Sequence, residues 1–169
     1  MNSFAQPLQS NAPLINRDRL WQSLMDLAQL GATAKGGVCR LALTDLDRQA
    51  RDLFVQWCTA AGCSVSVDAI GNIFARRAGR NPNLPPVMTG SHIDTQPTGG
   101  KFDGCYGVMA GLEVIRTLND LGVETEAPIE VVVWTNEEGS RFPPCMMGSG
   151  VFAGKFDLQE TLDKQDEQG

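Results

Sequence analysis

One segment, residues 129–134, limits the possible folds more than any other. Its letters, IEVVVW, combine three consecutive valines with an isoleucine and a tryptophan, a composition typical of a buried β-strand. The run leads into Asn136, Glu137 and Glu138, so the predicted strand delivers two carboxylates at its carboxyl end. Ligands of α/β proteins bind beyond the carboxyl ends of strands. The segment therefore predicts both a fold class and the place of a site.

Helices are predicted from apolar periodicity and from end signals. Asn16 and Thr44 are each placed as the N-cap of a helix, and Gly62 ends the second of these. A further helix follows the glycine-rich stretch 98–107. The predicted helices cover approximately residues 17–30, 45–61 and 108–121.

Two other regions carry strand signals. Residues 64–67 alternate as a strand does, and residues 70–76 follow around a Gly71-Asn72 turn. Together they predict a hairpin. Residues 87–91 predict a short buried strand that places His92 at its carboxyl end. The order of helices and strands predicts an α/β sandwich with a mixed sheet. From Gly154 onward the chain is acidic and polar, and we expect no helix cap or further core element there.

Composition narrows the protein class. Hydrophobic residues make up 42% and charged residues 20% of the 169 residues, as in ordinary globular proteins. The net charge of −6 argues against nucleic-acid and anionic-membrane partners, which attract basic surfaces. Residues 1–13 lack the pattern of a signal peptide, and no apolar run approaches the length of a membrane span. Five cysteines without CxxC spacing predict reduced thiols and a cytoplasmic protein.

Side chains suited to metal binding follow the predicted strands. His92 and Asp94 come after one strand, Asp103 lies in the glycine-rich stretch, and Glu137 and Glu138 follow another strand. Imidazole and carboxylate groups bind zinc and related divalent ions. Each signal alone is weak, because paired acids at a strand end are more often a solvated loop. Together, the three segments predict a metal site at one edge of the sheet.

The residue types also suggest roles. Asp94 is placed to accept the second ring N–H of His92 and so to fix its tautomer. Asp103 is placed to bridge two metal ions. Paired glutamates can divide the work, one binding a metal and the other accepting a proton. A phosphate-binding loop is excluded because the chain has no G-x-x-x-x-G-K-[ST] pattern.

Three motifs in this order resemble the N-carbamoyl-L-amino-acid hydrolase family, which includes β-ureidopropionase-like and allantoate amidohydrolase-like enzymes. The motifs are GSHIDT (90–95), GGKFDG (99–104) and TNEEGSRF (135–142). The family belongs to a larger clan of aminoacylases and carboxypeptidases with paired zinc ions. The resemblance spans about residues 14–169 and implies a zinc-aminopeptidase-like three-layer sandwich.

The resemblance also assigns roles to this chain. It makes His92 a ligand of one metal, Asp103 the bridge and Glu138 a ligand of the second metal. The catalytic residues it implies are Glu137, the general base for the attacking water, and Asp94, which supports the histidine. Two divalent metal ions are the implied cofactors, with zinc expected and manganese or cobalt as alternatives. The implied reaction converts an N-carbamoyl-L-amino acid into the amino acid, CO2 and ammonia.

The resemblance, together with the ligand count, implies that residues 1–169 are the N-terminal part of a catalytic domain. His92 is the chain's single histidine, whereas two tetrahedral zinc ions need about eight coordination positions. The resemblance places two more histidine ligands, the rest of that domain and a dimerisation domain in a part that this chain lacks. Members of the family are homodimers, and the resemblance implies a small-molecule substrate with unknown substrate-binding residues. The alternatives are an aminoacylase or dipeptidase of the same clan, or an inactive fragment acting as a weak metal-binding or interaction module.

Overall fold

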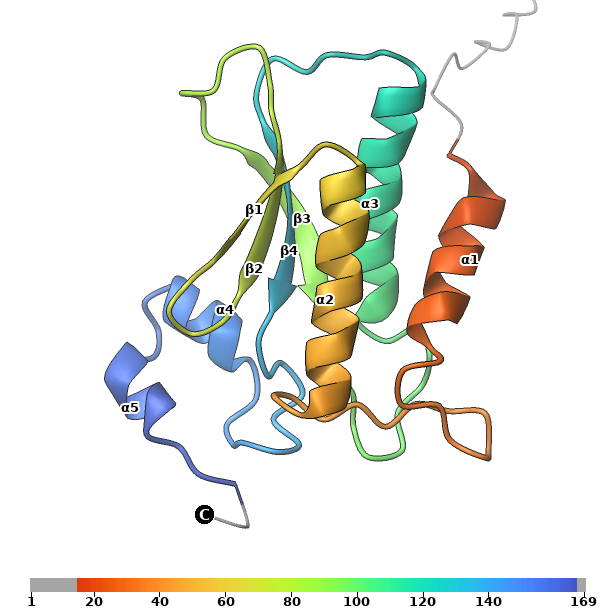
Figure 1. Cartoon of the computed structure of the whole chain (residues 1–169). Helices are drawn as coiled ribbons and strands as arrows, with labels where there is room; N and C mark the ends of the chain where they lie inside the picture. The colour runs from red at the N-terminus through yellow and green to blue at the C-terminus, as the bar shows by residue number, and fades with distance from the viewer. Residues whose placement is uncertain (1–14, 167–169) are drawn as a thin grey trace, which may run out of the picture.

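A mixed four-stranded sheet organises the fold (Figure 1). The computed structural model describes residues 15–166, so the signal-peptide prediction for residues 1–13 lies outside the described residues. The sheet order is β1-β2-β4-β3, with β3 parallel to β4 and the other neighbours antiparallel. The predicted hairpin and mixed sheet are confirmed. The strands are β1 (Ser64–Val67), β2 (Ile73–Arg77), β3 (Val87–His92) and β4 (Ile129–Trp134).

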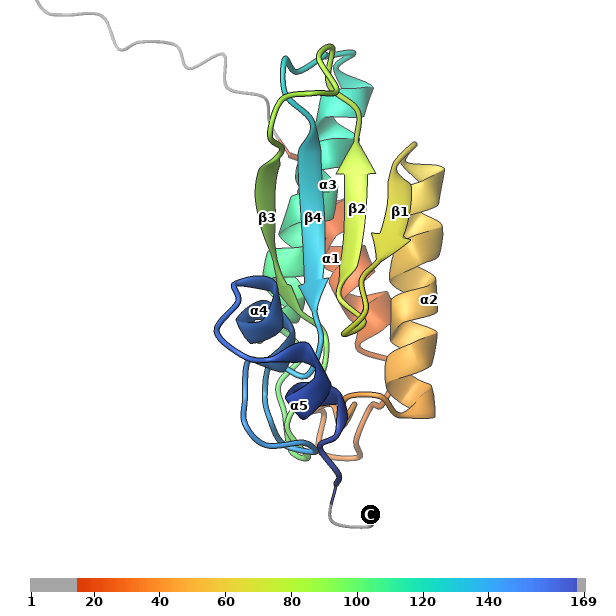
Figure 2. The same ribbon diagram turned by 90° about the vertical axis from the view of Figure 1, so that its left-hand side faces the viewer.

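Helices lie on both sides of this sheet. On one side α3 packs on β3 and β4, α2 packs on β1, and α1 packs on α3. The short helices α4 and α5 lie on the other side, beyond the carboxyl end of β4 (Figures 1 and 2). The α/β architecture predicted from the order of elements is therefore confirmed. The helices are α1 (Arg17–Leu27), α2 (Asp45–Ala60), α3 (Cys105–Asp120), α4 (Met147–Phe152) and α5 (Leu158–Leu162).

The two predicted N-caps hold their helices as expected. Asn16 Oδ1 accepts from the backbone N–H of Arg19, and Thr44 Oγ1 accepts from that of Asp47. These bonds satisfy N–H groups that have no partner within the first turn. Helix α3 begins earlier than predicted, at Cys105, because Gly104 adopts a φ of +63° and turns the chain into the helix.

The hydrophobic core lies between the sheet and the layer formed by α1, α2 and α3. Phe54 of α2 and Leu112 of α3 are fully buried there, together with Val131 of the central strand β4. Burial of a side chain of this size stabilises the folded state by about 1.5–3 kcal/mol. The core therefore holds α3 and the parallel pair β3–β4 together, which fixes where their ends meet.

The C-terminal part of the described chain is more ordered than predicted. Asp157 caps α5 by accepting from the backbone N–H of Glu160 at 3.0 Å. The ring of Phe152 in α4 lies 5.6 Å from that of Phe74 and 5.2 Å from that of Trp134. The expectation of no cap beyond Gly154 was wrong, because a single side-chain cap supports this short helix.

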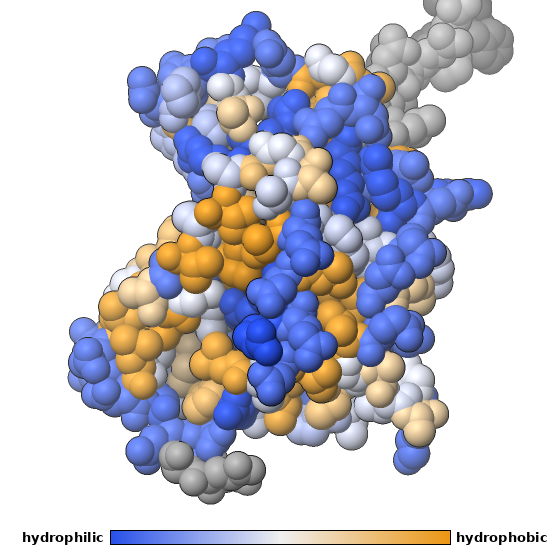
Figure 3. Space-filling model, in the orientation of Figure 1, coloured by the Kyte–Doolittle hydropathy of each residue, from blue (hydrophilic) through white to orange (hydrophobic). Residues whose placement is uncertain are grey.

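Apolar side chains also reach the surface. In the orientation of Figure 1, they gather from the middle of the visible face towards α4 (Figure 3). Val67, Val87 and Phe152 are among the exposed large apolar residues. Contiguous apolar surface of this kind is typical of contacts with another segment or chain. Within residues 15–166, no helix combines the length and hydropathy that crossing a membrane requires.

All five cysteines are free thiols, and their burial predicts an order of reactivity. Burial raises the pKa of Cys58, Cys63 and Cys105, whereas Cys145 is exposed. Only the thiolate reacts quickly with alkylating reagents. We therefore expect iodoacetamide at neutral pH to label Cys145 first and Cys58 only after denaturation, as read by peptide mass spectrometry. Rapid labelling of Cys58 in the folded chain would contradict the packing described here.

Candidate active site at the carboxyl ends of β3 and β4

The parallel pairing of β3 and β4 brings the predicted site residues to one edge. His92, the last residue of β3, lies opposite Trp134, the last residue of β4. The segments that follow both strands therefore leave the sheet side by side. A turn at buried Asn136, with φ of +49°, then directs the two glutamates towards the end of β3.

His92 is held in one orientation by its own neighbourhood. The side chain is 5% exposed, and Nδ1 lies 2.8 Å from the backbone carbonyl oxygen of Asp94. A carbonyl oxygen only accepts, so Nδ1 carries a proton, and Nε2 is the ring nitrogen left to face other partners. Nε2 lies 3.2 Å from Glu137 Oε2 and 3.9 Å from Asp103 Oδ1. Nε2 therefore faces two carboxylates beyond the carboxyl ends of β3 and β4.

The carboxylate of Asp94 supports the glutamates rather than the histidine ring. It accepts from the backbone N–H groups of Glu137 and Glu138, at 3.3 and 3.2 Å. Its Oδ1 lies 3.7 Å from His92 Nδ1, beyond hydrogen-bond distance, and the ring N–H is taken by the Asp94 carbonyl instead. Asp94 is 2% exposed, and this burial raises the pKa of its carboxyl group, while the two N–H donors act in the opposite direction. Asp94 therefore joins the two strand ends.

The two glutamates face different partners. Glu137 points at His92, and burial raises the pKa of its carboxyl group, opposed by the imidazole and reinforced by the neighbouring carboxylates. Glu138 Oε2 accepts from Gln96 Nε2 at 3.0 Å. Gln96 was not identified from the sequence, since an exposed glutamine in a loop has no distinctive signal. The different partners agree with separate roles for the glutamates.

Asp103 and Gly104 approach the histidine from the loop before α3. The Asp103 side chain is 73% exposed, so its oxygens are accessible to a cation. A Cβ built on Gly104 would lie 2.5 Å from three ring atoms of His92, including Nε2. Only glycine lets the backbone approach the imidazole this closely. The glycine-rich stretch therefore serves to place Asp103 beside the ring.

The donor atoms at this edge are of the types that bind divalent metal ions, but they do not surround a metal position. An imidazole nitrogen and carboxylate oxygens converge at one edge, which is the chemistry that zinc, manganese and cobalt accept. Within residues 15–166, however, no three His, Cys, Asp or Glu side chains are close enough to form a ligand cluster. The described residues therefore supply an open, partial metal site.

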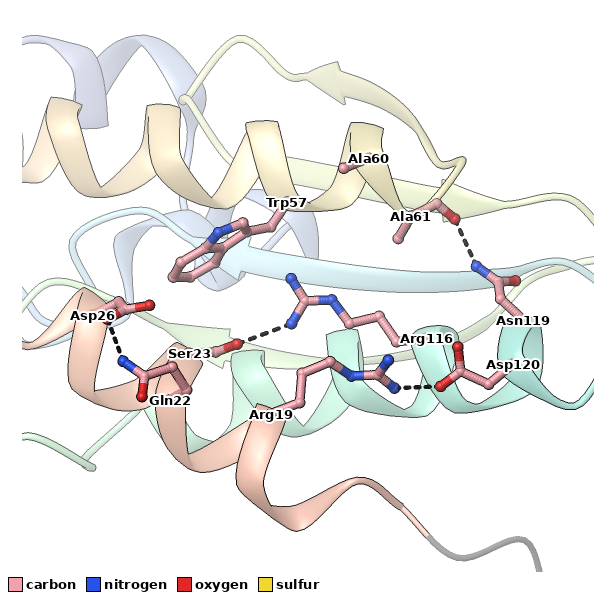
Figure 4. Close-up of a pocket in the computed structure, with 10 residues that line it drawn as sticks. All are labelled: Arg19, Gln22, Ser23, Asp26, Trp57, Ala60, Ala61, Arg116, Asn119 and Asp120. Atoms are coloured by element: carbon pink, nitrogen blue, oxygen red, sulfur yellow. Dashed lines mark hydrogen bonds and ion pairs between the residues drawn. The ribbon is translucent and has the colours of Figure 1, made fainter.

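A separate hollow of about 410 Å³ lies between α1 and the carboxyl-terminal ends of α2 and α3 (Figure 4). Arg19 there bonds to Glu113 and Asp120, and Arg116 donates to Ser23 Oγ at 2.9 Å. These contacts join the helices to one another. None of the predicted site residues lines this hollow, so we assign it a structural role.

Comparison with known proteins gives a consistent result. Residues 88–167 match the model of peptidase family M20/M25/M40. N-carbamoyl-L-amino-acid amidohydrolase from Rhizobium meliloti is 53% identical over 155 residues, covering 92% of this chain and 37% of that protein. Allantoate amidohydrolase from Bacillus subtilis (strain 168) is 38% identical over 143 residues, covering 85% of this chain and 35% of that protein.

Solved structures agree with these relatives. An amidase of the hydantoinase/carbamoylase family from Burkholderia multivorans superposes with a TM-score of 0.93 at 63% identity, covering 94% of this chain and 38% of that one. The chain thus spans a little over a third of the length of the proteins it matches. The M20 family is generally metal-dependent, and the substrates named for these relatives differ. Over most of its own length, the chain is therefore similar to part of the proteins of the hydantoinase/carbamoylase family in the M20 clan, a family of amidohydrolases that act on carbon–nitrogen bonds other than peptide bonds.

Proposed function

We propose that this chain contributes part of the active site of an amidohydrolase that cleaves N-carbamoyl-L-amino acids. The observation that carries the proposal is the convergence of His92 Nε2, Glu137 and Asp103 at the carboxyl edge of β3 and β4. The 53% identity to the Rhizobium meliloti N-carbamoyl-L-amino-acid amidohydrolase supports this substrate class. The products are the free amino acid, CO2 and ammonia.

In this proposal, four side chains divide the work of holding metal and moving protons. His92 would bind one divalent ion through Nε2, Glu138 would bind a second, and Asp103 would bridge them. We expect zinc, with manganese and cobalt also compatible with an oxygen-rich donor set. When bound, such an ion polarises a substrate carbonyl and makes water more acidic.

Glu137 is the proposed general base. Its carboxylate accepts a proton from the attacking water, and the water oxygen bonds to the ureido carbonyl carbon. The same carboxyl group then returns the proton to the departing α-nitrogen as the carbon–nitrogen bond breaks, and the resulting carbamic acid separates into CO2 and ammonia. Burial raises the pKa of Glu137, which strengthens it as a base. Asp94 holds the backbone of this glutamate in place.

We further propose that residues 1–169 form the N-terminal part of a catalytic domain. The proposal is supported by the partial donor set and by the chain's coverage of a little over a third of its relatives. Further ligands and the substrate-binding residues would come from a continuation of the chain or from a second chain. The chain alone would then hold metal weakly.

A zinc titration of the purified chain tests the ligand assignment. We expect weak zinc binding that depends on His92, because His92 supplies the only imidazole of the chain. His92→Ala should lose this binding, as measured by calorimetry and by elemental analysis after dialysis. An unchanged titration for His92→Ala would contradict the proposed site.

The substrate assignment needs a separate assay. In the longest active form of the protein, N-carbamoyl-L-amino acids should be hydrolysed faster than allantoate, as measured by ammonia release. Faster hydrolysis of allantoate would keep the amidohydrolase proposal but overturn its substrate.

A further inference from the structure

We infer that Arg40 is a positioning residue. It fixes the distance between the segment that carries His92 and the segment that carries Asp103. The inference rests on the proposed metal site and extends it to a residue buried behind that site. Arg40 is 1% exposed and is the largest fully buried side chain of the described residues.

The first set of contacts joins Arg40 to the segment that follows β3. Its Nε donates to the carbonyl oxygen of Ile93 at 2.8 Å, one residue after His92. Its backbone N–H donates to Thr95 Oγ1 at 2.8 Å, and its carbonyl oxygen accepts from the Thr95 N–H at 2.9 Å. Three hydrogen bonds therefore hold the backbone on both sides of Asp94, whose carbonyl orients the histidine ring.

The second contact reaches the segment that carries Asp103. Arg40 Nη2 donates to Cys105 Sγ at 3.2 Å. Cys105 is the first residue of α3 and lies two residues after Asp103. The same guanidinium group thus contacts both segments.

A third set of contacts anchors the guanidinium to the helical layer. Nη1 donates to the carbonyl oxygens of Leu27 and Leu30, at 3.0 and 2.6 Å, at the end of α1. Leu27 is a core residue and Leu30 packs against the core, so these bonds hold the guanidinium group in a fixed place. The guanidinium has five donors spread over three nitrogens, so it can bond acceptors on several sides at once, whereas an ammonium has three donors on a single nitrogen and an apolar side chain has none.

The environment of Arg40 shows why its role is specific. Among the ion pairs formed within residues 15–166, none includes Arg40, so its charge is buried against neutral acceptors. Burying a cation in this way is costly, and filling the same volume with an apolar side chain is cheaper. Unlike an apolar side chain, the guanidinium group hydrogen-bonds to both segments and so holds them at a fixed separation. Supporting residues of this kind set the orientation and spacing of metal ligands.

The test compares Arg40→Lys with Arg116→Lys. Arg116 also donates a hydrogen bond from a partly buried position, but it lies in the hollow of Figure 4, among helices rather than at the site. We expect about 10- to 100-fold weaker zinc binding for Arg40→Lys and unchanged zinc binding for Arg116→Lys. Calorimetric titration measures the affinity, and thermal denaturation of both variants measures how much stability each has lost.

A pair of gentler variants covers the case in which Arg40→Lys does not fold. Cys105→Ala removes only the acceptor at the start of α3, whereas Cys105→Ser keeps an acceptor there. We expect Cys105→Ala to weaken zinc binding and Cys105→Ser to restore most of it. Equal affinity for Cys105→Ala and the unsubstituted chain would overturn the link to α3 and with it the proposal.

The outcomes separate this inference from the proposed function. Unaltered zinc affinity in a folded Arg40→Lys variant, with His92→Ala still losing zinc, would overturn the role of Arg40 alone. If the unsubstituted chain bound no zinc, the proposed metal site would be wrong, and the positioning role of Arg40 would be wrong as well. Equal losses of affinity for Arg40→Lys and Arg116→Lys would also overturn the inference, because the effect would follow general destabilisation.

Discussion

Glu137→Gln is expected to remove most hydrolysis of N-carbamoyl-L-amino acids while leaving metal binding intact. Glutamine keeps the size of the side chain and its contact with His92 but cannot accept the proton of the attacking water. General acid–base catalysis contributes a factor on the order of 10²–10⁴, and kcat should fall by about that factor. The measurement pairs steady-state kinetics with elemental analysis of bound metal in the longest active form of the protein.

Two further variants make this result specific. Glu138→Gln changes the adjacent carboxylate, the proposed ligand, and should lose both metal and turnover. Glu126→Gln changes a glutamate whose ion pair with Arg80 is 63% exposed on both sides, and it should alter neither. Near-normal turnover by Glu137→Gln would show that another group is the base. Loss of metal by Glu137→Gln would make it a ligand instead.

The parts of the fold that were predictable are those specified by local sequence. The bounds of β4 follow from its apolar β-branched run, and Asn16 and Thr44 act as the expected N-caps. The parallel pairing of β3 with β4 then brings His92 level with Trp134. Because parallel strands share a carboxyl edge, finding the two strands was enough to predict that their following segments meet.

The short helix α4 (Met147–Phe152) was missed because its support is not local. Its six residues include two glycines, which disfavour a helix in isolation. Contacts distant in sequence hold it instead: Asn72 Nδ2 donates to the carbonyl oxygen of Gly148, and Phe152 packs near Phe74 and Trp134. Tertiary contacts therefore override the weak local preference.

The hydrogen-bond partners within the site could not be predicted from the sequence either. The H-x-D spacing predicted a bond from the His92 ring to the Asp94 carboxylate, but the backbone carbonyl of Asp94 lies closer to Nδ1. The carboxylate is then free to accept from Glu137 and Glu138, an arrangement that depends on how β4 ends. Arg40 was missed for a similar reason: an arginine in sequence is read as a surface residue until its acceptors are known.

Gly104→Ala is expected to lower zinc affinity by about 100-fold or more, the upper range for losing the support of a metal ligand. A Cβ at this position would lie 2.5 Å from Cδ2, Cε1 and Nε2 of His92. The ring is buried and held by the Asp94 carbonyl, so it cannot move aside without breaking the bond that fixes its tautomer. The substitution therefore acts on the proposed ligand itself, and zinc titration measures the loss.

Gly122→Ala is the matched control for this substitution. Gly122 has a φ of +62°, against +63° for Gly104, but no atom lies within 4 Å of its built Cβ. Gly122→Ala should lose about 1–2 kcal/mol of stability, because an L-residue is disfavoured at positive φ. Gly104→Ala should lose more, because its Cβ also meets the ring of His92. Only Gly104→Ala should also lose zinc affinity. Equal zinc affinity in the two variants would show that the close approach of Gly104 to His92 does not govern metal binding, whereas a selective loss would tie the glycine-rich stretch directly to the function of His92.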